Sequence, residues 1–452
     1  MKKILLVGNG GREHALCEAL FQSPQEKEIY NFATAINPGI KKLAKEIIVG
    51  NIMDLVELKR IAQKIQPDFA IIGPDDPIGI GSTDALAEIG VPSFAPTKAC
   101  AQLEGSKSFT RNLLKKYNID ASPAFKVFEN VQQTSLRKKF FDDFRGQIVV
   151  KADGLLGGKG VLVAGDHFTD FEEAEDFAVK SIQKFGRVVL EEKLLGEEFS
   201  LISLVDGETV LDTPAIQDHK RAFEGDTGPN TGGMGCISDE RHSLPFLTSQ
   251  DIKQAHHITV QTMKAIASEL GEKFVGVMYG GFIVTARGIK LIEYNARFGD
   301  PEALNILPIL KTDFIDICEK AIQGKLSEIG ELEFSPYATV VKYLCPNGYP
   351  TNPVKNGEIF DRRKTNVCSP VSKVFFASVA EENGKLLLKG SRAIGVVGMG
   401  KTLEEANNAC ESEIKKFSGP LFYRKDIGTQ SLIQKRTEHM KEIRGGFILF
   451  SK

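Results

Sequence analysis

The N-terminal segment restricts the possible folds more than any other part of the chain. The apolar run Ile4–Val7 ends at the turn Gly8-Asn9-Gly10-Gly11, and the pattern from Arg12 to Leu20 has helical spacing. A buried strand, a tight turn and a helix in this order are typical of the start of a doubly wound α/β domain. Further elements of the same kind are a buried strand at Phe69–Ile72 and helical patterns at Asp54–Ile65 and Thr83–Ile89. We therefore predict an N-terminal Rossmann-like domain over residues 1–103.

The pattern changes near Gly105, and a chain of 452 residues is long enough for about three domains. A helix at Ser108–Tyr117, capped near Ser106, opens a mixed α+β region that we expect to reach residue 326. Its predicted strands are Ile148–Ala152, Val161–Ala164, Val188–Glu192, Phe199–Val205, Val210–Ile216, Gly281–Thr285 and Lys290–Tyr294. From Tyr337, strands alternate with Gly/Pro turns before a helix at Leu403–Phe417, which predicts a small C-terminal α+β domain.

Composition excludes several classes of function. The formal charge of −2 provides no basic field that would attract nucleic acid or a membrane surface. The seven cysteines are scattered without a C-x-x-C pair, which favours reduced thiols in a cytoplasmic protein. No apolar run approaches the roughly 18 residues that a membrane-spanning helix requires.

The glycine-rich segment Asp153–Gly160 contains Gly157, Gly158, Lys159 and Gly160. It is not a Walker A loop, because Lys159 is followed by glycine and then by a strand rather than by Ser/Thr and a helix. A glycine-rich loop between two strands instead indicates a hairpin flap whose backbone N–H groups can cover phosphates, with Lys151 and Lys159 on either side. The alternative is a glycine-rich turn that binds no ligand.

The N-terminal turn has a weaker signal. The third glycine of a dinucleotide-binding G-x-G-x-x-G pattern would fall at Glu13, whose side chain would obstruct a pyrophosphate. The turn can still bind one phosphate at the start of its helix, next to Arg12. A turn that only packs the helix against the strand explains the pattern equally well.

The strand around Glu293 has the spacing of a metal site. Residues alternate in and out along a strand, so Glu293 and Asn295 share one face, as two oxygen ligands for Mg²⁺ would. Arg297 joins the same face if the strand continues, where it could meet a phosphate in transfer. A half-exposed edge strand with a polar face is the alternative.

The segment Asp218–Gly235 concentrates charge and then turns. Lys220 and Arg221 provide cations for phosphate, and Asp218 could hold an amine. The glycines, Asn and Thr that follow would form a loop rich in free N–H donors. From composition alone, this loop could equally be exposed and flexible.

This segment, together with Ile292–Glu302, closely resembles the phosphoribosylamine–glycine ligase (glycinamide ribonucleotide synthetase) family of ATP-grasp enzymes. The resemblance spans roughly residues 1–428 and includes Gly8–His14, Gln102–Lys107, Val150–Gly160 and Arg424–Gly428. It implies ATP-dependent joining of glycine to 5-phosphoribosylamine through glycyl phosphate, in purine synthesis. It implies no protein nucleophile, so catalysis would rest on positioning and electrostatics.

The resemblance also implies roles for individual residues. ATP would be bound by Lys107, Lys151, the glycine-rich loop of a mobile subdomain at 122–193, the hinge at Glu191, Glu192 and Leu194, and Glu198 on the ribose. Mg²⁺ or Mn²⁺ would be bound by Glu293 and Asn295. Catalysis would involve Arg297, Asp218 and Lys220. The other substrate contacts would be Gly10, Arg12, Glu13, Gly73, Pro74, Asp75, Asn230, Thr231 and Gly232.

The chain departs from the family pattern in three places: Asn37-Pro38-Gly39-Ile40, Asp75-Asp76-Pro77-Ile78, and Tyr279–Phe282, which lacks a second metal carboxylate. The tail at 429–452 lies beyond the resemblance, and we expect its helix at Gln434–Arg444 to dock on the body. A monomer or weak homodimer that binds only small molecules is expected. Another ATP-grasp ligase or carboxylase, a regulatory nucleotide-binding protein and an NAD-dependent oxidoreductase are the competing hypotheses.

Overall fold

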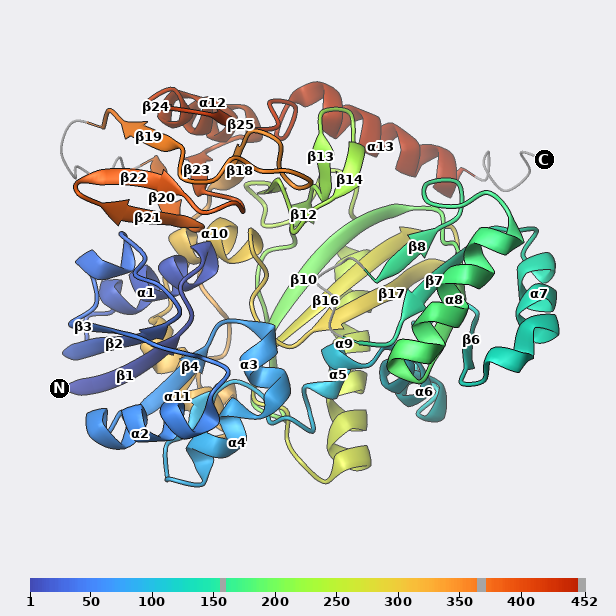
Figure 1. Cartoon of the computed structure of the whole chain (residues 1–452), viewed down its shortest axis with the longest axis horizontal. Coiled ribbons are helices and arrows are strands. Elements are labelled where there is room, and N and C mark those ends of the chain that lie inside the picture. Colours follow the sequence, from blue (N-terminus) through green and yellow to red (C-terminus); the bar gives the residue numbers. More distant parts are fainter. Residues whose placement is uncertain (155–159, 364–370, 446–452) are drawn as a thin grey trace.

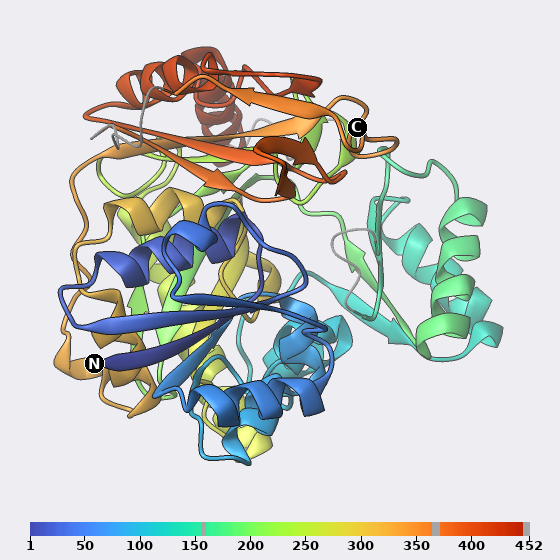
Figure 2. The same cartoon turned by 60° about the vertical axis from the view of Figure 1, so that its left-hand side comes forward.

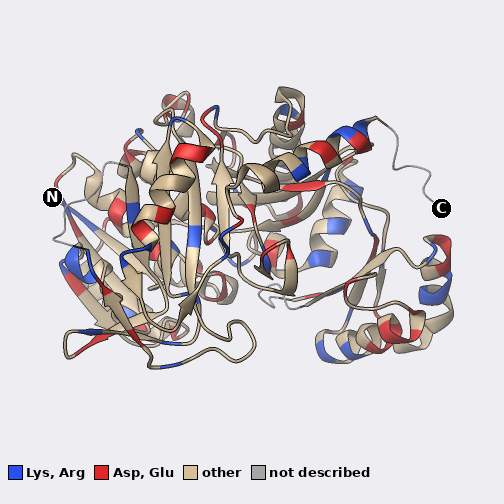
Figure 3. Ribbon diagram, turned by 90° about the horizontal axis from the view of Figure 1, so that it is seen from above, with Lys and Arg blue, Asp and Glu red and all other residues tan. Residues whose placement is uncertain are grey.

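The computed structural model describes residues 1–154, 160–363 and 371–445. The N-terminal domain and the C-terminal domain lie against one another, a central sheet lies beside them, and a small subdomain stands at the far end (Figures 1 and 2). Lys and Arg are interspersed with Asp and Glu over the ribbon (Figure 3), in keeping with the net charge of −2. No helix in the described part of the chain has the length and apolarity needed to cross a membrane.

The N-terminal domain is the predicted doubly wound fold. Its sheet is parallel, with strand order β3-β2-β1-β4-β5. The bounds are β1 (Lys2–Val7), β2 (Lys27–Ala33), β3 (Glu46–Val49), β4 (Phe69–Ile72) and β5 (Ser93–Phe94), with α1 (Gly11–Gln22), α2 (Leu55–Ile65), α3 (Asp75–Ile80) and α4 (Ser82–Ala87). Residues Ile4–Val7 are fully buried, because helices cover both faces of a parallel sheet. Asp54 starts α2 by accepting hydrogen bonds from two backbone N–H groups of its first turn.

The outlying subdomain is an antiparallel sheet with its own core. The strand order is β6-β9-β7-β8, with β6 (Phe125–Phe128), β7 (Ile148–Ala152), β8 (Val161–Val163) and β9 (Val188–Glu192), and the helices are α7 (Thr134–Asp143) and α8 (Phe171–Phe185). Buried Phe128, Val150, Phe168 and Leu190 belong to a cluster separate from the main core. Figure 2 shows this subdomain apart from the rest of the molecule.

The central sheet is antiparallel and has the order β11-β10-β16-β17. Its strands are β10 (Glu197–Val205), β11 (Val210–Asp212), β16 (Gly276–Thr285) and β17 (Gly288–Asn295), and α5 (Gln102–Gly105), α6 (Lys107–Lys116) and α9 (Ser249–Leu270) pack near it. The expected cap of α6 is confirmed, since Ser106 accepts a hydrogen bond from the Phe109 N–H. The strand predicted at Val210–Ile216 ends at Asp212, because Pro214 has no N–H to donate; Ile216 forms only an isolated bridge to Ser200.

The C-terminal sheet has the order β12-β15-β18-β23-β20, with β25 paired to β18. Its strands are β12 (Gln217–Asp218), β15 (Gly235–Ser238), β18 (Ala338–Pro346), β20 (Ser372–Phe376), β23 (Ile394–Gly400) and β25 (Leu421–Phe422). A smaller sheet contains β19 (Glu358–Asp361), β21 (Val379–Glu382), β22 (Lys385–Leu388) and β24 (Phe417–Ser418). The helix predicted to end at Phe417 is α12 (Leu403–Ile414); Phe417 begins β24 and pairs with Asp361.

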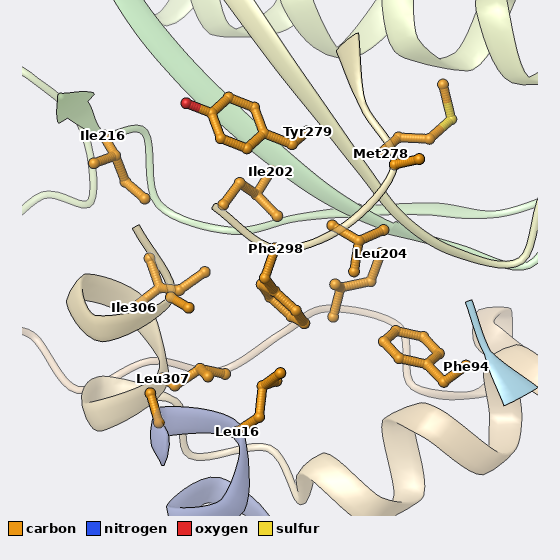
Figure 4. Close-up of a cluster of buried hydrophobic side chains, with 14 of the residues drawn as sticks. Leu16, Phe94, Ile202, Leu204, Ile216, Met278, Tyr279, Phe298, Ile306 and Leu307 are labelled. Carbon is orange, nitrogen blue, oxygen red and sulfur yellow. The ribbon is translucent and has the colours of Figure 1, made fainter. Parts of the chain in front are cut away.

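A shared core joins the N-terminal domain to the central sheet. Leu16 of α1 and Phe94 of β5 lie in one buried cluster with Leu204 of β10, Met278 of β16 and Phe298 (Figure 4). Two short helices, α10 (Glu302–Ile306) and α11 (Phe314–Ile322), complete this junction. The two regions are therefore held together by apolar packing rather than by a flexible linker.

The tail helix α13 (Gln430–Arg444) starts earlier than predicted and packs on β10 and β16. Leu432, Ile433, Met440 and Ile443 are its buried residues. Docking of the tail helix on the body is thus confirmed over these residues, whereas the apolar end at Phe447–Phe450 lies outside the described residues.

Candidate active site

A buried ionic triad joins the subdomain to the central sheet. Arg111 of α6 pairs with both carboxylate oxygens of Glu191, at 2.6 and 3.0 Å, and Lys151 Nζ lies 2.8 Å from the same group. Burial opposes ionisation of Glu191, but attraction by Arg111 and Lys151 outweighs it and lowers the pKa to about 2. The Glu191 side chain, predicted at the nucleotide hinge, is therefore engaged in this triad, and its backbone lies in β9 between β6 and β7.

The base of the glycine-rich loop is held from α6. Lys107 Nζ donates to the Gly154 carbonyl at 2.8 Å, and Asp153 accepts from Ser108 Oγ at 2.6 Å. Across the loop, the Ala152 N–H donates to the Gly160 carbonyl at 2.8 Å. The loop thus joins two antiparallel strands, as expected; Gly157, Gly158 and Lys159 lie outside the described residues.

The other hinge residues make surface contacts. Glu192 accepts from Arg287 at 2.8 Å and from the Ala124 N–H at 3.0 Å. Leu194 lies between β9 and β10. Glu198, the residue predicted at the ribose, follows on β10 with its side chain 3.8 Å from Lys220 Nζ.

A cavity between β10, β12, β16 and β17 brings together residues predicted for three roles: Glu198, Asp218, Lys220 and Glu293. Desolvation opposes the charge on Lys220, but the surrounding carboxylates, Glu198 and Glu293 foremost, raise its pKa. Burial, with the nearby charge of Glu302, raises the pKa of Asp218. The pKa of Glu293 is lowered despite burial, first through Lys220 and then Lys107.

The two residues predicted to bind a metal, Glu293 and Asn295, share one face of β17. Glu293 is opposite Gly281 and Asn295 is opposite Tyr279 across the ladder, so no side chain of β16 faces Glu293. The described residues contain no group of three His, Cys, Asp or Glu side chains arranged for a metal. Two oxygen ligands suit a Mg²⁺ ion that takes its remaining ligands from substrate phosphates and water.

Arg297 lies after the end of β17 and not on the strand itself. The strand β17 ends at Asn295, because the next N–H donates to Glu104 Oε2 at 2.7 Å rather than to a neighbouring strand. The Arg297 guanidinium lies 3.3 Å from Glu104 and 3.9 Å from Asp75. Burial opposes the charge on Asp75, but Arg297 lowers its pKa. The predicted catalytic arginine and a predicted substrate residue are therefore neighbours.

The N-terminal turn is closed by Glu13. Its carboxylate accepts from the Gly10 N–H at 2.6 Å and from Arg12 Nε at 2.6 Å. A Cβ at Gly73 would lie only 2.1 Å from Glu13 Oε1, so this position requires glycine. The turn and the segment that begins at Gly73-Pro74 are thus in direct contact, although Arg12 and Glu13 are buried rather than open to solvent.

The turn at Thr231–Gly233 is fixed by Arg392 from the C-terminal domain. Arg392 Nη1 donates to the carbonyls of Gly232, Gly233 and Asp300, at 2.7, 2.9 and 2.6 Å. Thr231 Oγ1 donates to the Lys220 carbonyl at 2.8 Å. Asn230 ends β14 (Thr227–Asn230), which pairs with β13 (Arg221–Phe223) in an exposed hairpin.

Asp300 joins the three parts of the molecule. Its carboxylate accepts from Tyr343 Oη at 2.6 Å and from the Arg12 N–H at 3.3 Å, and it lies 3.5 Å from Arg392. Burial opposes ionisation, but Arg392 and Arg12 lower the pKa of Asp300. A negative charge therefore holds the N-terminal turn and the C-terminal domain in fixed relation to β17.

Sequence reasoning missed Arg111 and Arg392. Arg111 had a signal, because it lies three residues before Leu114 on the buried face of α6, where an arginine requires an ionic partner. Arg392 had none, since it stands alone in a loop and its acceptors are backbone carbonyls distant in sequence.

Solved structures share the architecture of the chain over nearly its whole length. The chain superposes on biotin carboxylase from Campylobacter jejuni with a TM-score of 0.72 at 13% identity, covering 98% of each chain. It superposes on the biotin carboxylase domain of the Hydrogenobacter thermophilus 2-oxoglutarate carboxylase, solved with MgADP, with a TM-score of 0.70 at 15% identity, covering 98% of this chain and 95% of that one. The family model of the phosphoribosylglycinamide synthetase ATP-grasp (A) domain matches residues 105–303 of this fold, so the chain is an ATP-grasp enzyme, a class that uses ATP with divalent metal ions.

The family follows from closer relatives. Family models of the phosphoribosylglycinamide synthetase N domain, ATP-grasp (A) domain and C domain match residues 2–104, 105–303 and 339–430. Phosphoribosylamine–glycine ligases from Methanococcus vannielii and Methanocaldococcus jannaschii are each 45% identical over 98% of this chain and 100% of their own length. That from Thermotoga maritima superposes with a TM-score of 0.78 at 28% identity, covering 94% of this chain and 100% of that one. The chain belongs to the phosphoribosylglycinamide synthetase family of carbon–nitrogen ligases.

Proposed function

We propose that the protein joins glycine to 5-phosphoribosylamine and splits ATP to ADP and phosphate, giving glycinamide ribonucleotide in purine biosynthesis. The relatives named above carry this activity in their names. The observation that carries the proposal is the position of Lys220. It lies among Glu198, Asp218 and Glu293, the residues predicted to contact the ribose, the amine and the metal. The charge of Lys220 therefore acts on all three carboxylates.

The chemistry proceeds in two steps. A carboxylate oxygen of glycine bonds to the γ-phosphorus of ATP, and the bond from that phosphorus to ADP breaks. The amine nitrogen of phosphoribosylamine then bonds to the carbonyl carbon of glycyl phosphate, loses a proton, and releases phosphate. No protein nucleophile takes part, so catalysis depends on charge neutralisation and alignment.

The cations of the site fit the first step. Lys107 and Lys151 lie at the base of the flap, and the charges of Lys220 and Arg297 both act on Glu293. Together they would balance charge on the transferring phosphoryl group. Glu293 and Asn295 would hold Mg²⁺ or Mn²⁺, which supplies further charge neutralisation at the phosphates when bound.

Asp218 and Glu302 are the proposed acceptors for the glycine ammonium group. The two carboxyl groups are close enough to raise the pKa of Asp218, and Tyr279 Oη fixes Glu302 by donating at 2.7 Å. An ammonium group between the two carboxyl groups would offset the repulsion between their negative charges.

Phosphoribosylamine would bind next to Arg297, at the N-terminal domain. The residues proposed for this substrate are Gly10, Arg12, Glu13, Gly73, Pro74 and Asp75, and Asp75 provides the contact to Arg297. We assign this domain to residues 1–103, the ATP-grasp region to 104–326 with its flap at 122–193, and the C-terminal domain to 327–428.

Phosphate release tests the function. The purified protein is mixed with ATP, Mg²⁺, glycine and freshly made phosphoribosylamine, and each component is omitted in turn. Phosphate release should require both glycine and phosphoribosylamine, and mass spectrometry should detect glycinamide ribonucleotide. Release that does not depend on glycine refutes the assignment.

A further inference from the structure

The strand segment Asp218–Lys220 has a second face. Asp218 and Lys220 line the cavity, whereas His219 is buried on the opposite side, as alternation along an extended segment requires. The His219 N–H donates to the Gly235 carbonyl at 3.0 Å. Charges of Arg424, Asp226 and Arg436 act on His219 from behind.

These groups belong to an ionic network that includes the tail helix. Arg436 of α13 pairs with Asp226 in the turn of the β13–β14 hairpin, and its Nη1 lies 3.0 Å from Glu197 Oε2. His439, one turn further along α13, lies 2.5 Å from the other oxygen of Glu197. Asp226 also pairs with Arg424 at 2.9 Å. Figure 1 shows α13 beside this hairpin.

The two carboxylates that Arg436 joins lie on segments that also carry site residues. Glu197 is 3% exposed and directly precedes Glu198, whose side chain is on the cavity side of β10. Asp226 closes the hairpin that begins directly after Lys220. On the cavity side, Glu198 and Lys220 lie 3.8 Å apart.

We infer that the tail helix positions the nucleotide site, with Arg436 as the residue that fixes the spacing of Glu198 and Lys220 from behind. The expected change in KM for ATP rests on the proposed function, whereas the structural role of Arg436 does not. Arg436 lies beyond residue 430, where the match to the family C domain ends. The network is partly buried, and breaking a buried ion pair leaves an uncompensated charge that loosens its surroundings.

Arg436→Gln removes one cation from between Glu197 and Asp226, while Arg424 still pairs with Asp226. The KM for ATP should rise about three- to tenfold with little change in kcat, because a displaced ribose contact weakens ground-state binding. Arg436→Lys retains the cation and should recover part of the loss. Arg444→Gln is the matched control: it breaks an arginine–carboxylate pair of the same helix, with Asp251 at 2.5 Å, outside the network.

Hydrogen–deuterium exchange provides a readout that is independent of activity. In the enzyme without substrates, Arg436→Gln should speed exchange at 197–199 and 217–230, whereas Arg444→Gln should leave these segments as in the unaltered protein. Equal exchange and equal KM for ATP in the two variants would overturn the inference. If the unaltered protein shows no glycine-dependent turnover, the proposed function fails, and the exchange comparison still decides the role of Arg436.

Discussion

At the scale of single residues, the site depends on charges whose ionisation is set by their neighbours. Glu293 remains ionised although it is buried, because Lys220, Lys107 and Lys151 are close. Glu191 remains ionised for a similar reason, through Arg111 and Lys151. Lys151 therefore acts on both the carboxylate of the buried triad, Glu191, and the proposed metal ligand, Glu293.

Replacing Glu293 with alanine should abolish ADP formation, because the proposed metal would retain only Asn295 as a side-chain ligand. ADP is measured with glycine and phosphoribosylamine at saturation. Glu208→Ala is the control, since Glu208 is an exposed carboxylate paired with Lys273 at 2.6 Å. Near-normal turnover in Glu293→Ala refutes the metal role.

His14 should make stability depend on pH. It is buried beside Phe375 and Phe376, and its Nδ1 accepts from the Phe376 N–H at 2.9 Å. Desolvation lowers its pKa from 6.5 to about 3. The unfolded chain therefore binds the proton more readily, so His14 contributes full stability above pH 6.5 and loses it progressively as the pH falls toward 3.

The measurement compares urea unfolding of the unaltered protein and His14→Gln at pH 7.5 and pH 5. The unaltered protein should lose about 2 kcal/mol more of its unfolding free energy than the variant over this interval. Gln is chosen because it keeps a hydrogen-bond acceptor but does not titrate. Equal losses would show that His14 is not buried as a neutral imidazole.

At the scale of elements, loops from one domain complete the site of another. The strands β12 and β15 flank the hairpin that follows Lys220. They belong to the C-terminal sheet, although in sequence they precede β16 and β17 of the central sheet. Arg392, before β23 of the same sheet, holds the turn at Thr231–Gly233. The C-terminal domain thus shapes a loop proposed to contact substrate.

Arg392→Gln should lower kcat/KM for glycine roughly tenfold, because three carbonyls would lose their charged donor and the turn would relax. Steady-state kinetics with varied glycine measure the effect. Lys389→Gln is the control, because Lys389 lies on the same connection but pairs with exposed Glu382 at 2.7 Å. An unchanged value in Arg392→Gln would contradict a role for the turn.

Local sequence signals predicted local elements well. The strand–turn–helix at the N-terminus, the Ser106 cap of α6 and the shared face of Glu293 and Asn295 all follow from neighbouring residues. Arg297 would share this face only if the strand continued, and β17 ends at Asn295, because a distant carboxylate, Glu104, accepts the hydrogen bond of the next N–H. Contacts between distant segments leave no periodic pattern in the sequence.

The turn at Asn37–Ile40 makes contacts of the same long-range kind. Gly39 lies directly against the imidazole of His14, where a Cβ would be 1.8 Å from Cε1. Asn37 Nδ2 donates to the Phe376 carbonyl at 2.7 Å. This turn therefore binds the N-terminal domain to the C-terminal sheet, a role that the sequence pattern alone does not indicate.

At the scale of the whole molecule, three parts share one hydrophobic core, whereas the flap subdomain has a core of its own. The N-terminal domain, the central sheet and the C-terminal sheet share one continuous core, and Asp300 joins them by polar contacts. The flap subdomain has a separate core and stands apart in Figure 2. Separate cores allow rigid-body movement without unfolding.

Binding of a non-hydrolysable ATP analogue with Mg²⁺ should therefore close the flap onto the central sheet. Small-angle X-ray scattering should show a smaller radius of gyration with the analogue than without it, and AMP should have little effect because it lacks the β- and γ-phosphates that the flap is proposed to cover. An unchanged radius at saturating analogue contradicts closure.

An oxygen atom of glycine can be followed to show whether the enzyme works through glycyl phosphate. Glycine labelled with ¹⁸O in its carboxylate is supplied with ATP, Mg²⁺ and phosphoribosylamine, and the released phosphate is analysed by mass spectrometry. Each phosphate should contain one ¹⁸O atom, because the carboxylate oxygen that attacks the γ-phosphorus leaves with it. Unlabelled phosphate would mean that water, and not glycine, attacks ATP, and would contradict the account.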